Sequence, residues 1–270
     1  MNGTPEVMYA IPSPILMLAL LVTMGLAIYI GTRMGKNRAS RTSEEGRAQV
    51  SALQGSLLGL LALLLGFSFS LALGRYDDRS VAVITEANAI GTAWLRTDLV
   101  AEPARGDLRK ALVDYTAERV EAGGNDMTQT EDRNRLLSAA QGQFTQIWAL
   151  ASTLARETPN PATVSLTSSL NDMIDAFSAR DAALNRHVPE PVLWLLFVTF
   201  VFMGWTLGFS SRVAGERPSP PVLMLVLLIV LVMGAILDLD RPRRGLIGID
   251  QSAMSATLDA MRAEIAAQAS

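Results

Sequence analysis

LQGSLLGLLALLLGFSFSLALG, residues Leu53–Gly74, is a run of apolar and small residues without an acidic or basic side chain. Crossing about 30 Å of hydrocarbon takes roughly 20 helical residues, so this stretch can span a membrane as a helix. Three further stretches share its character: 11–31, 191–211 and 218–237. The last one is short unless its proline-rich start contributes. The sequence therefore predicts four transmembrane helices rather than the buried core helices of a soluble protein.

The four apolar stretches form two pairs, which divide the chain into four regions. These are the first membrane helix pair with its loop, an extramembrane region, the second pair and a tail, at residues 1–74, 75–188, 189–237 and 238–270. The extramembrane region repeats apolar residues at helical spacing and has no alternating strand pattern. We therefore predict an all-α membrane protein with a 2+2 arrangement and a large helical region between the second and third membrane helices.

Local signals place several helix ends and faces in these polar regions. No breaker follows the second membrane helix until Pro103, so that helix is expected to continue to about Leu99. Asn160 followed by Pro161 predicts an N-cap and the first residue of a helix. In the tail, helical spacing predicts a short amphipathic helix whose apolar stripe is Met254, Leu258, Met261 and Ile265.

Composition excludes several classes of function. The chain of 270 residues has no Cys and one His, His187, so disulfides, thiolate metal sites and multi-His metal sites are not available. It also lacks a P-loop and the GxGxxG, HExxH and GxSxG motifs. We expect no enzymatic activity, no catalytic residue, no metal site and no cofactor. The formal charge of -3 argues against a nucleic-acid partner.

The charges of the short loops predict an orientation in the membrane. Basic residues outnumber acidic ones in the loops 32–50 and 212–221, whereas the region 75–187 is acidic. Because positive residues in short loops tend to stay in the cytoplasm, both short loops are expected there. The termini and the extramembrane region would then lie outside.

The second membrane helix carries the candidate pore-lining residues. Glycines and hydroxyls interrupt its leucines, and two phenylalanines could form a constriction; the candidates are Gly59, Gly66, Phe67, Ser68, Phe69 and Ser70. The pair Gly55 and Gly59 also has the spacing that lets helices approach closely, so plain helix packing is the alternative. None of the four apolar stretches contains a charge. This weighs against a pump but not against a channel with a hydrophobic gate.

Charged and amide side chains gather where the second and fourth membrane helices leave the membrane and further along the second. We expect a structural polar cluster at Arg75, Asp77, Arg79, Glu86, Asn88, Arg96, Asp238, Asp240 and Arg241. A salt bridge between Arg79 and Asp240 is one hypothesis, and interfacial anchoring with ordinary helix capping is the alternative. Glu86 and Asn88 are the best candidates for buried polar contacts.

Several of these residues also form recognisable motifs. They are Arg75-Tyr76-Asp77, Glu86-Ala87-Asn88-Ala89-Ile90-Gly91-Thr92, Leu95-Arg96, Arg186-His187-Val188-Pro189 and Asp238-Leu239-Asp240-Arg241-Pro242. Spread over most of the chain, they resemble the signature of the bestrophin-like membrane proteins known as the DUF4239 family. The resemblance implies a multi-pass protein of the bacterial inner membrane, distantly similar to bestrophin anion channels. Those channels are ring-shaped oligomers of four-helix subunits whose second membrane helix lines the pore.

Two functions follow from the residues and the resemblance together. The first is an oligomeric passive anion channel, whose partners would be the lipid bilayer, further copies of the chain and small anions. The second is a non-conducting, membrane-anchored helical scaffold or sensor that binds a partner through residues 75–187. The resemblance also implies that the extramembrane region is cytoplasmic, whereas the loop charges place it outside.

Overall fold

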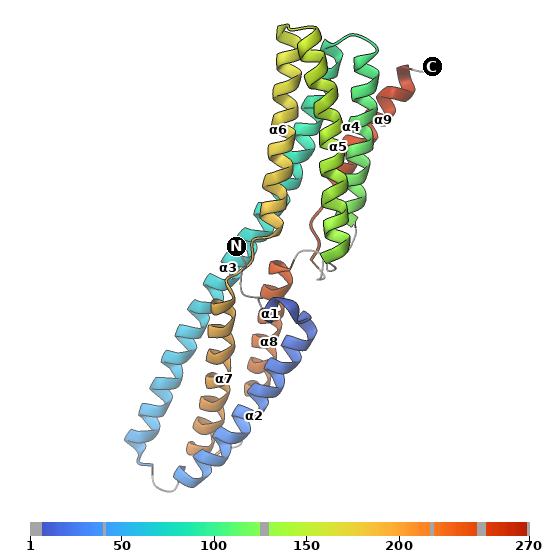
Figure 1. Ribbon diagram of the computed structural model, residues 1–270. Coiled ribbons are helices and arrows are strands. Elements are labelled where there is room, and N and C mark those ends of the chain that lie inside the picture. Colours follow the sequence, from blue (N-terminus) through green and yellow to red (C-terminus); the bar gives the residue numbers. More distant parts are fainter. Residues whose placement is uncertain (1–6, 40–41, 125–129, 217–218, 242–246, 269–270) are drawn as a thin grey trace. The chain divides into compact units, whose positions relative to one another are not determined.

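The computed structural model describes residues 7–39, 42–124, 130–216, 219–241 and 247–268 (Figure 1). In these ranges every regular element is a helix, which confirms the predicted all-α fold. The elements are α1 (Val7–Ala10), α2 (Ser13–Ala39), α3 (Glu44–Arg96), the 3-10 helix η1 (Thr97–Leu99), α4 (Ala104–Gly124), α5 (Thr130–Glu157), α6 (Pro161–Leu184), α7 (Glu190–Val213), α8 (Pro220–Asp240) and α9 (Ser252–Gln268).

Four helices, α2, α3, α7 and α8, are long and apolar enough to cross a membrane. Both α2 and α3 extend beyond their apolar stretches, because the flanking residues contain no proline and form helix readily. In particular, α3 runs without a break from Glu44 to Arg96 and η1 then ends at Leu99, as predicted. The predicted start of the fourth membrane helix, residue 218, lies outside the described ranges, as does Pro242.

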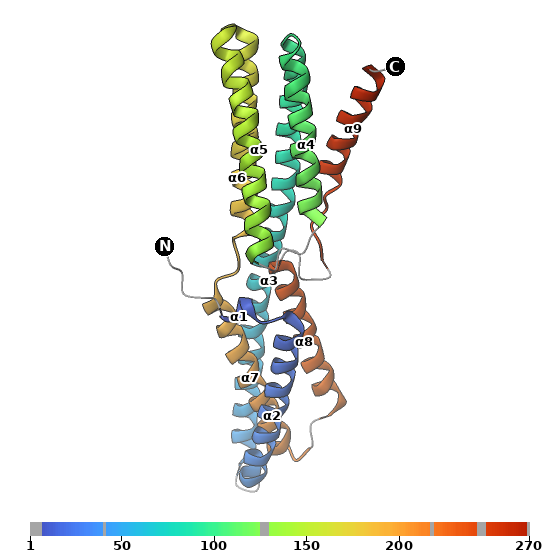
Figure 2. The ribbon, with the colours of Figure 1, turned by 45° about the vertical axis from the view of Figure 1, so that its right-hand side comes forward.

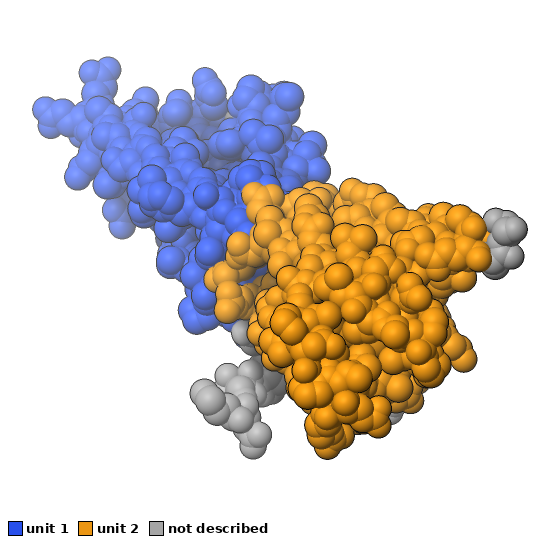
Figure 3. Space-filling model, turned by 90° about the horizontal axis from the view of Figure 1, so that it is seen from above, with its two compact units in different colours: residues 1–74, 187–241 blue, residues 75–186, 242–270 orange. Residues whose placement is uncertain are grey.

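The chain divides into two compact units, coloured in Figure 3. Unit 1 contains Met1–Gly74 and His187–Arg241, and unit 2 contains Arg75–Arg186 and Pro242–Ser270. The tail therefore belongs with the extramembrane region from residue 242 onwards. The four-way division of the chain into domains remains a proposal, because compactness does not measure whether a region folds alone.

Unit 1 is built around α2, which packs against α7 and α8. Large buried side chains from these helices meet in its core, including Leu20, Met24, Phe200, Met203, Ile229 and Ile236. Leucine and valine side chains on the remaining faces are exposed, for example Leu18, Leu195 and Leu227. An apolar exterior around a packed apolar interior is the distribution expected of helices that face lipid.

Unit 2 is a bundle of α4, α5, α6 and the second half of α3, with α9 against α4 (Figure 2). The ring of Phe144 lies 4.8 Å from that of Tyr115 and 5.0 Å from that of Phe177, so α4, α5 and α6 meet in an aromatic core. The predicted cap of α6 is confirmed: Asn160 and Thr163 form a reciprocal capping box, and Pro161 is the first helical residue.

The amphipathic tail helix is confirmed as α9, but its expected stripe is wrong at one position. Met254, Leu258 and Met261 are buried, whereas Ile265 is 40% exposed. The residue that continues the inner face is Glu264, which bonds to Trp94 and Arg109. The buried face of α9 therefore ends in a polar contact, in which the Glu264 carboxylate accepts hydrogen bonds from both Trp94 and Arg109.

Candidate functional site

The membrane half of α3 has one face toward the rest of unit 1 and one face that the chain leaves uncovered. Leu61, Ser68 and Ala72 are buried on the inner face. The other pore-lining candidates, Gly59, Gly66, Phe67, Phe69 and Ser70, are exposed. A Cβ added at Gly55, Gly59 or Gly66 would meet nothing within 4 Å. The candidate lining residues other than Ser68 are thus free to face a conduit or a further subunit.

The close helix contact in unit 1 uses different glycines from the pair that the sequence suggested. A Cβ at Gly35 of α2 would lie 2.7 Å from the carbonyl oxygen of Phe209 on α7, and one at Gly204 would lie 3.0 Å from that of Met24. Gly31 and Gly208 leave even less room, against the backbone carbonyls of Trp205 and Ile28. Gly31/Gly35 and Gly204/Gly208 therefore bring α2 and α7 together. Both pairs have the four-residue spacing that lets helices approach closely, but only Gly55 and Gly59 were considered from the sequence.

Glu86, on the extramembrane half of α3, is the centre of a buried polar cluster in unit 2. It is fully buried, and Tyr115 Oη and Arg119 Nε each donate to its Oε1 over 2.7 Å. Arg180 Nη1 donates to Oε2 over 2.7 Å. Burial, followed by the charge of Glu86, raises the pKa of Tyr115 well above its ordinary value of 10.0, so its hydroxyl remains a donor at neutral pH.

The partners of Glu86 come from two helices. Tyr115 and Arg119 lie on α4, Arg180 lies on α6, and Arg180 Nη2 also donates to Gln251 Oε1 over 2.8 Å. A carboxylate between two guanidinium groups makes strong charge-assisted hydrogen bonds, so this cluster fixes how the helices pack. Glu86 was predicted from the sequence as a buried polar contact, but its partners were not. Arg119 follows Tyr115 by four residues and so lies on the apolar stripe of α4. A charged residue on that stripe was the sequence signal for a buried ion pair.

Arg79 donates hydrogen bonds to backbone carbonyls at the C-terminal end of α6. Its side chain is 1% exposed, Nε donates to the carbonyl of Ala183 over 3.3 Å and Nη2 donates to that of Arg186 over 2.6 Å. Carbonyls of the last helical turn have no partner within the helix, so a buried arginine is a suitable donor for them. Arg79 belongs to unit 2 and Asp240 to unit 1. Their salt bridge remains a prediction, to be tested by charge reversal at both positions.

The other expected cluster members on α3 lie nearer the surface. Arg75 is half-buried and pairs with Asp78 at 3.9 Å, and Asp77 is exposed. Arg96 Nη1 donates to the carbonyl of Ser165 on α6 over 2.7 Å. Asn88 is exposed, in contrast to Glu86 two residues earlier. The helix turns by about 100° per residue, so two residues of spacing place their side chains on nearly opposite faces.

The charged end of α8 organises the entry into α7 and the N-terminal segment of unit 1. Asp240 Oδ1 accepts a hydrogen bond from the backbone N–H of Val188 over 2.7 Å. Arg241 donates to the carbonyls of Met8 and Ile11 and to Ser13 Oγ, and both Asp240 and Arg241 are 1% exposed. Asp238, one turn earlier, is half-buried, and its carbonyl accepts from the N–H of Arg241. These residues hold backbone groups that would otherwise be buried without partners.

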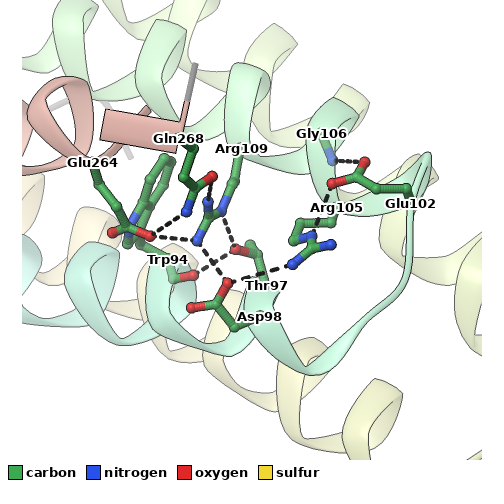
Figure 4. Close-up of polar contacts among 9 residues, drawn as sticks. All are labelled: Trp94, Thr97, Asp98, Glu102, Arg105, Gly106, Arg109, Glu264 and Gln268. Atoms are coloured by element: carbon green, nitrogen blue, oxygen red, sulfur yellow. Dashed lines mark hydrogen bonds and ion pairs between the residues drawn. The ribbon is translucent and has the colours of Figure 1, made fainter. Parts of the chain in front are cut away.

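A second polar cluster, which was not predicted from the sequence, joins α9 to α3 and α4 within unit 2 (Figure 4). Arg109 Nη2 donates to Glu264 Oε1 over 2.6 Å and to Asp98 Oδ1 over 2.7 Å, and its guanidinium lies 4.6 Å from the centre of the Trp94 ring. Trp94 Nε1 donates to Glu264 Oε2 over 2.7 Å. This hydrogen bond and the nearby charge of Arg109 lower the pKa of Glu264 below its ordinary value of 4.5.

The chain shares a domain with a known family of proteins. A family model of the bestrophin-like domain matches residues 17–254. The chain belongs to the bestrophin-like family. No curated protein matches the sequence. As a bestrophin-like chain with four apolar helices, it is a membrane protein. The narrower DUF4239 assignment stays a prediction.

Solved structures of a bacterial bestrophin homologue from Klebsiella pneumoniae share this fold. A tryptophan-to-alanine variant has a TM-score of 0.65 and 13% identity, with 91% of this chain and 93% of that chain covered. A leucine-to-threonine variant has a TM-score of 0.61 and 15% identity, with 91% and 96% covered. At such low identity the likeness establishes the fold of this bestrophin-like chain, and its function has to be argued from its own residues.

Proposed function

We propose that this bestrophin-like protein is an oligomeric passive anion channel whose second membrane helix lines the pore. The observation that carries the proposal is the uncovered face of α3 at Gly59, Gly66 and Ser70. Small residues and a hydroxyl leave space for a hydrated ion, and an aromatic side chain beside them can narrow that space. Phe67, which is 67% exposed, is the candidate constriction.

The uncovered face requires other subunits to complete a conduit. Within the chain, a Cβ at Gly59 or Gly66 would meet nothing within 4 Å, so one subunit supplies only one wall. A ring of copies around α3 would enclose the space between these walls. The membrane part of α3 has no acidic or basic residue, so an ion would pass without binding to a fixed charge. This suits passive conduction rather than ion-coupled pumping.

Anion flux from the purified protein in liposomes tests the proposal, with Gly66→Leu as the variant and Gly25→Leu as its matched control. Gly25 on α2 is also exposed, and a Cβ there would also meet nothing within 4 Å. Leucine at Gly66 should narrow the conduit and reduce flux by about tenfold or more, whereas leucine at Gly25 should leave flux unchanged. Equal flux in the two variants would contradict a pore lined by α3.

The same measurement separates the channel from a non-conducting scaffold. The extramembrane half of α3 exposes Val81, Ile84 and Leu95, which favour an interaction surface on unit 2. A scaffold would show no flux above that of protein-free liposomes for any permeant ion. Flux of cations but not anions would retain the channel and overturn its proposed selectivity.

A further inference from the structure

Unit 2 also contains a groove at the end of the bundle where α6 begins. It has a volume of about 940 Å³ and is lined by the end of η1, the loop into α4, the last turns of α5 and the first turn of α6. Figure 1 shows that the α3–α4 and α5–α6 connections lie at the same end of this unit. A volume of roughly 300–1,000 Å³ is typical of sites for small organic molecules.

The groove presents apolar surface to solvent. Leu99 and Leu150, which line it, are 55% and 37% exposed, and Ala149 beside Leu150 is exposed as well. Uncovered apolar surface in a concave site is removed from water when a ligand of matching character binds. The apolar part of the lining therefore favours a ligand with an apolar body.

The charged side chains that line the groove are all acidic. Its lining contains Glu102, Asp107 and Glu157 but no lysine or arginine. Glu102 already accepts from Arg105 and from the N–H of Gly106. In the described part of the chain, the side-chain carboxylates of Asp107 and Glu157 have no hydrogen bond or ion pair, in contrast to the backbone N–H of Asp107, which donates to Pro103. Two carboxylates are thus available at the groove.

The helix ends around the groove add to this negative character. The last turn of α5 ends in the lining at Glu157, and the carbonyls at a helix C-terminus carry partial negative charge. The N-terminus of α6 is already satisfied by its capping box. A metal ion is not favoured, because no group of three or more potential metal ligands lies together among the described residues. The lining instead combines apolar area with spare carboxylates.

We propose that this groove binds a small organic cation, an ammonium group on an apolar body. The ammonium would pair with Asp107 and Glu157, and the apolar body would cover Leu99, Ala149 and Leu150. The site is in unit 2 and does not depend on the channel function proposed for α3. A basic peptide would satisfy the same carboxylates, but a volume of about 940 Å³ lies in the range of sites for small organic molecules.

The test uses the full-length protein in lipid nanodiscs, with empty nanodiscs as the reference for partitioning into lipid. The probe is phenylbutylammonium, and phenylbutanol is its uncharged match. Titration calorimetry should show saturable binding of the amine and much weaker binding of the alcohol. Asp107→Asn combined with Glu157→Gln should weaken amine binding by about tenfold, because both ion pairs are lost at a partly exposed site. The matched control is Asp172→Asn with Asp175→Asn, two exposed carboxylates of α6 outside the groove.

A second variant fills the groove without changing its charge. Ala149→Phe should abolish binding of the amine while leaving helix content and thermal stability unchanged, since Ala149 is exposed. Loss of binding in both groove variants and retention in the control would support the site. Binding that is not saturable, or that is equal in all variants, would overturn it. So would saturable binding of a lysine- and leucine-rich peptide that the amine fails to displace, since the occupant would then be a protein.

Discussion

Arg180 Nη1 lies 2.7 Å from Glu86 Oε2, although 94 residues separate them in the sequence. Both side chains are buried, and each is held by further partners: Tyr115 and Arg119 for Glu86, and Gln251 for Arg180. The contact joins the extramembrane half of α3 to α6, and Gln251 adds the segment that leads into α9. Unit 2 is therefore fixed by a polar cluster as well as by its apolar core.

Glu86→Gln should destabilise unit 2 strongly. Removing one partner of a buried ion pair leaves an uncompensated charge, which costs about 3–5 kcal/mol. Chemical unfolding of the full-length protein, followed by tryptophan fluorescence, measures the loss. Glu121→Gln, an exposed glutamate on α4, is the control and should change stability by less than about 0.5 kcal/mol. A Glu86→Gln variant as stable as this control would show that the cluster contributes little.

Gly208→Ala should destabilise the packing of α2 against α7. A methyl group there meets the backbone carbonyl of Ile28, and overpacking of this kind costs roughly 1–3 kcal/mol. Thermal inactivation in detergent, read by size-exclusion chromatography, gives the effect. Gly25→Ala on the open face of α2 should be neutral or slightly stabilising, because alanine favours helix more than glycine does. Equal behaviour of the two variants would argue against close contact of α2 and α7.

Docking of α9 should weaken at acidic pH. Because the hydrogen bond from Trp94 and the charge of Arg109 lower the pKa of Glu264, its stabilising contribution is complete above about pH 4.5. The contribution is lost as the pH falls through the lowered pKa of the folded state. Hydrogen exchange of the α9 amides, corrected for intrinsic rates, should therefore show less protection in that acidic range. Glu264→Gln should remove the pH dependence, and a wild-type-like acid response in this variant would point to another group.

The two sides of the membrane can be assigned with single cysteines, because the natural chain has none. Gly142 on α5 and Glu45 at the start of α3 are both exposed. From the loop charges, a membrane-impermeant maleimide should label Gly142→Cys but not Glu45→Cys in intact cells. Permeabilised cells, in which both variants should react, provide the control. The opposite pattern in intact cells would place unit 2 in the cytoplasm, as the family resemblance implies.

Hydropathy and local helix signals were enough to predict the four membrane helices, the long continuation of α3 and the cap of α6. These features depend on runs of neighbouring residues: an uncharged apolar stretch, the absence of proline, and Asn160 directly before Pro161. The α9 stripe was predicted at three of its four apolar positions for the same reason. The prediction was wrong at Ile265 because the buried face of α9 is completed there by Glu264, whose donors Trp94 and Arg109 come from distant parts of the chain.

The tertiary structure alone decided which polar and small residues have partners. Glu86 and Asn88 looked equivalent in sequence, but one is fully buried and the other is exposed. Likewise, Gly55 and Gly59 have open space around them, whereas Gly31 and Gly208 press against facing backbone. Spacing along one helix shows which residues share a face, but the element that faces them is set by packing between segments distant in sequence. For this protein, local sequence determined the helices, and tertiary packing determined which of their faces remain open.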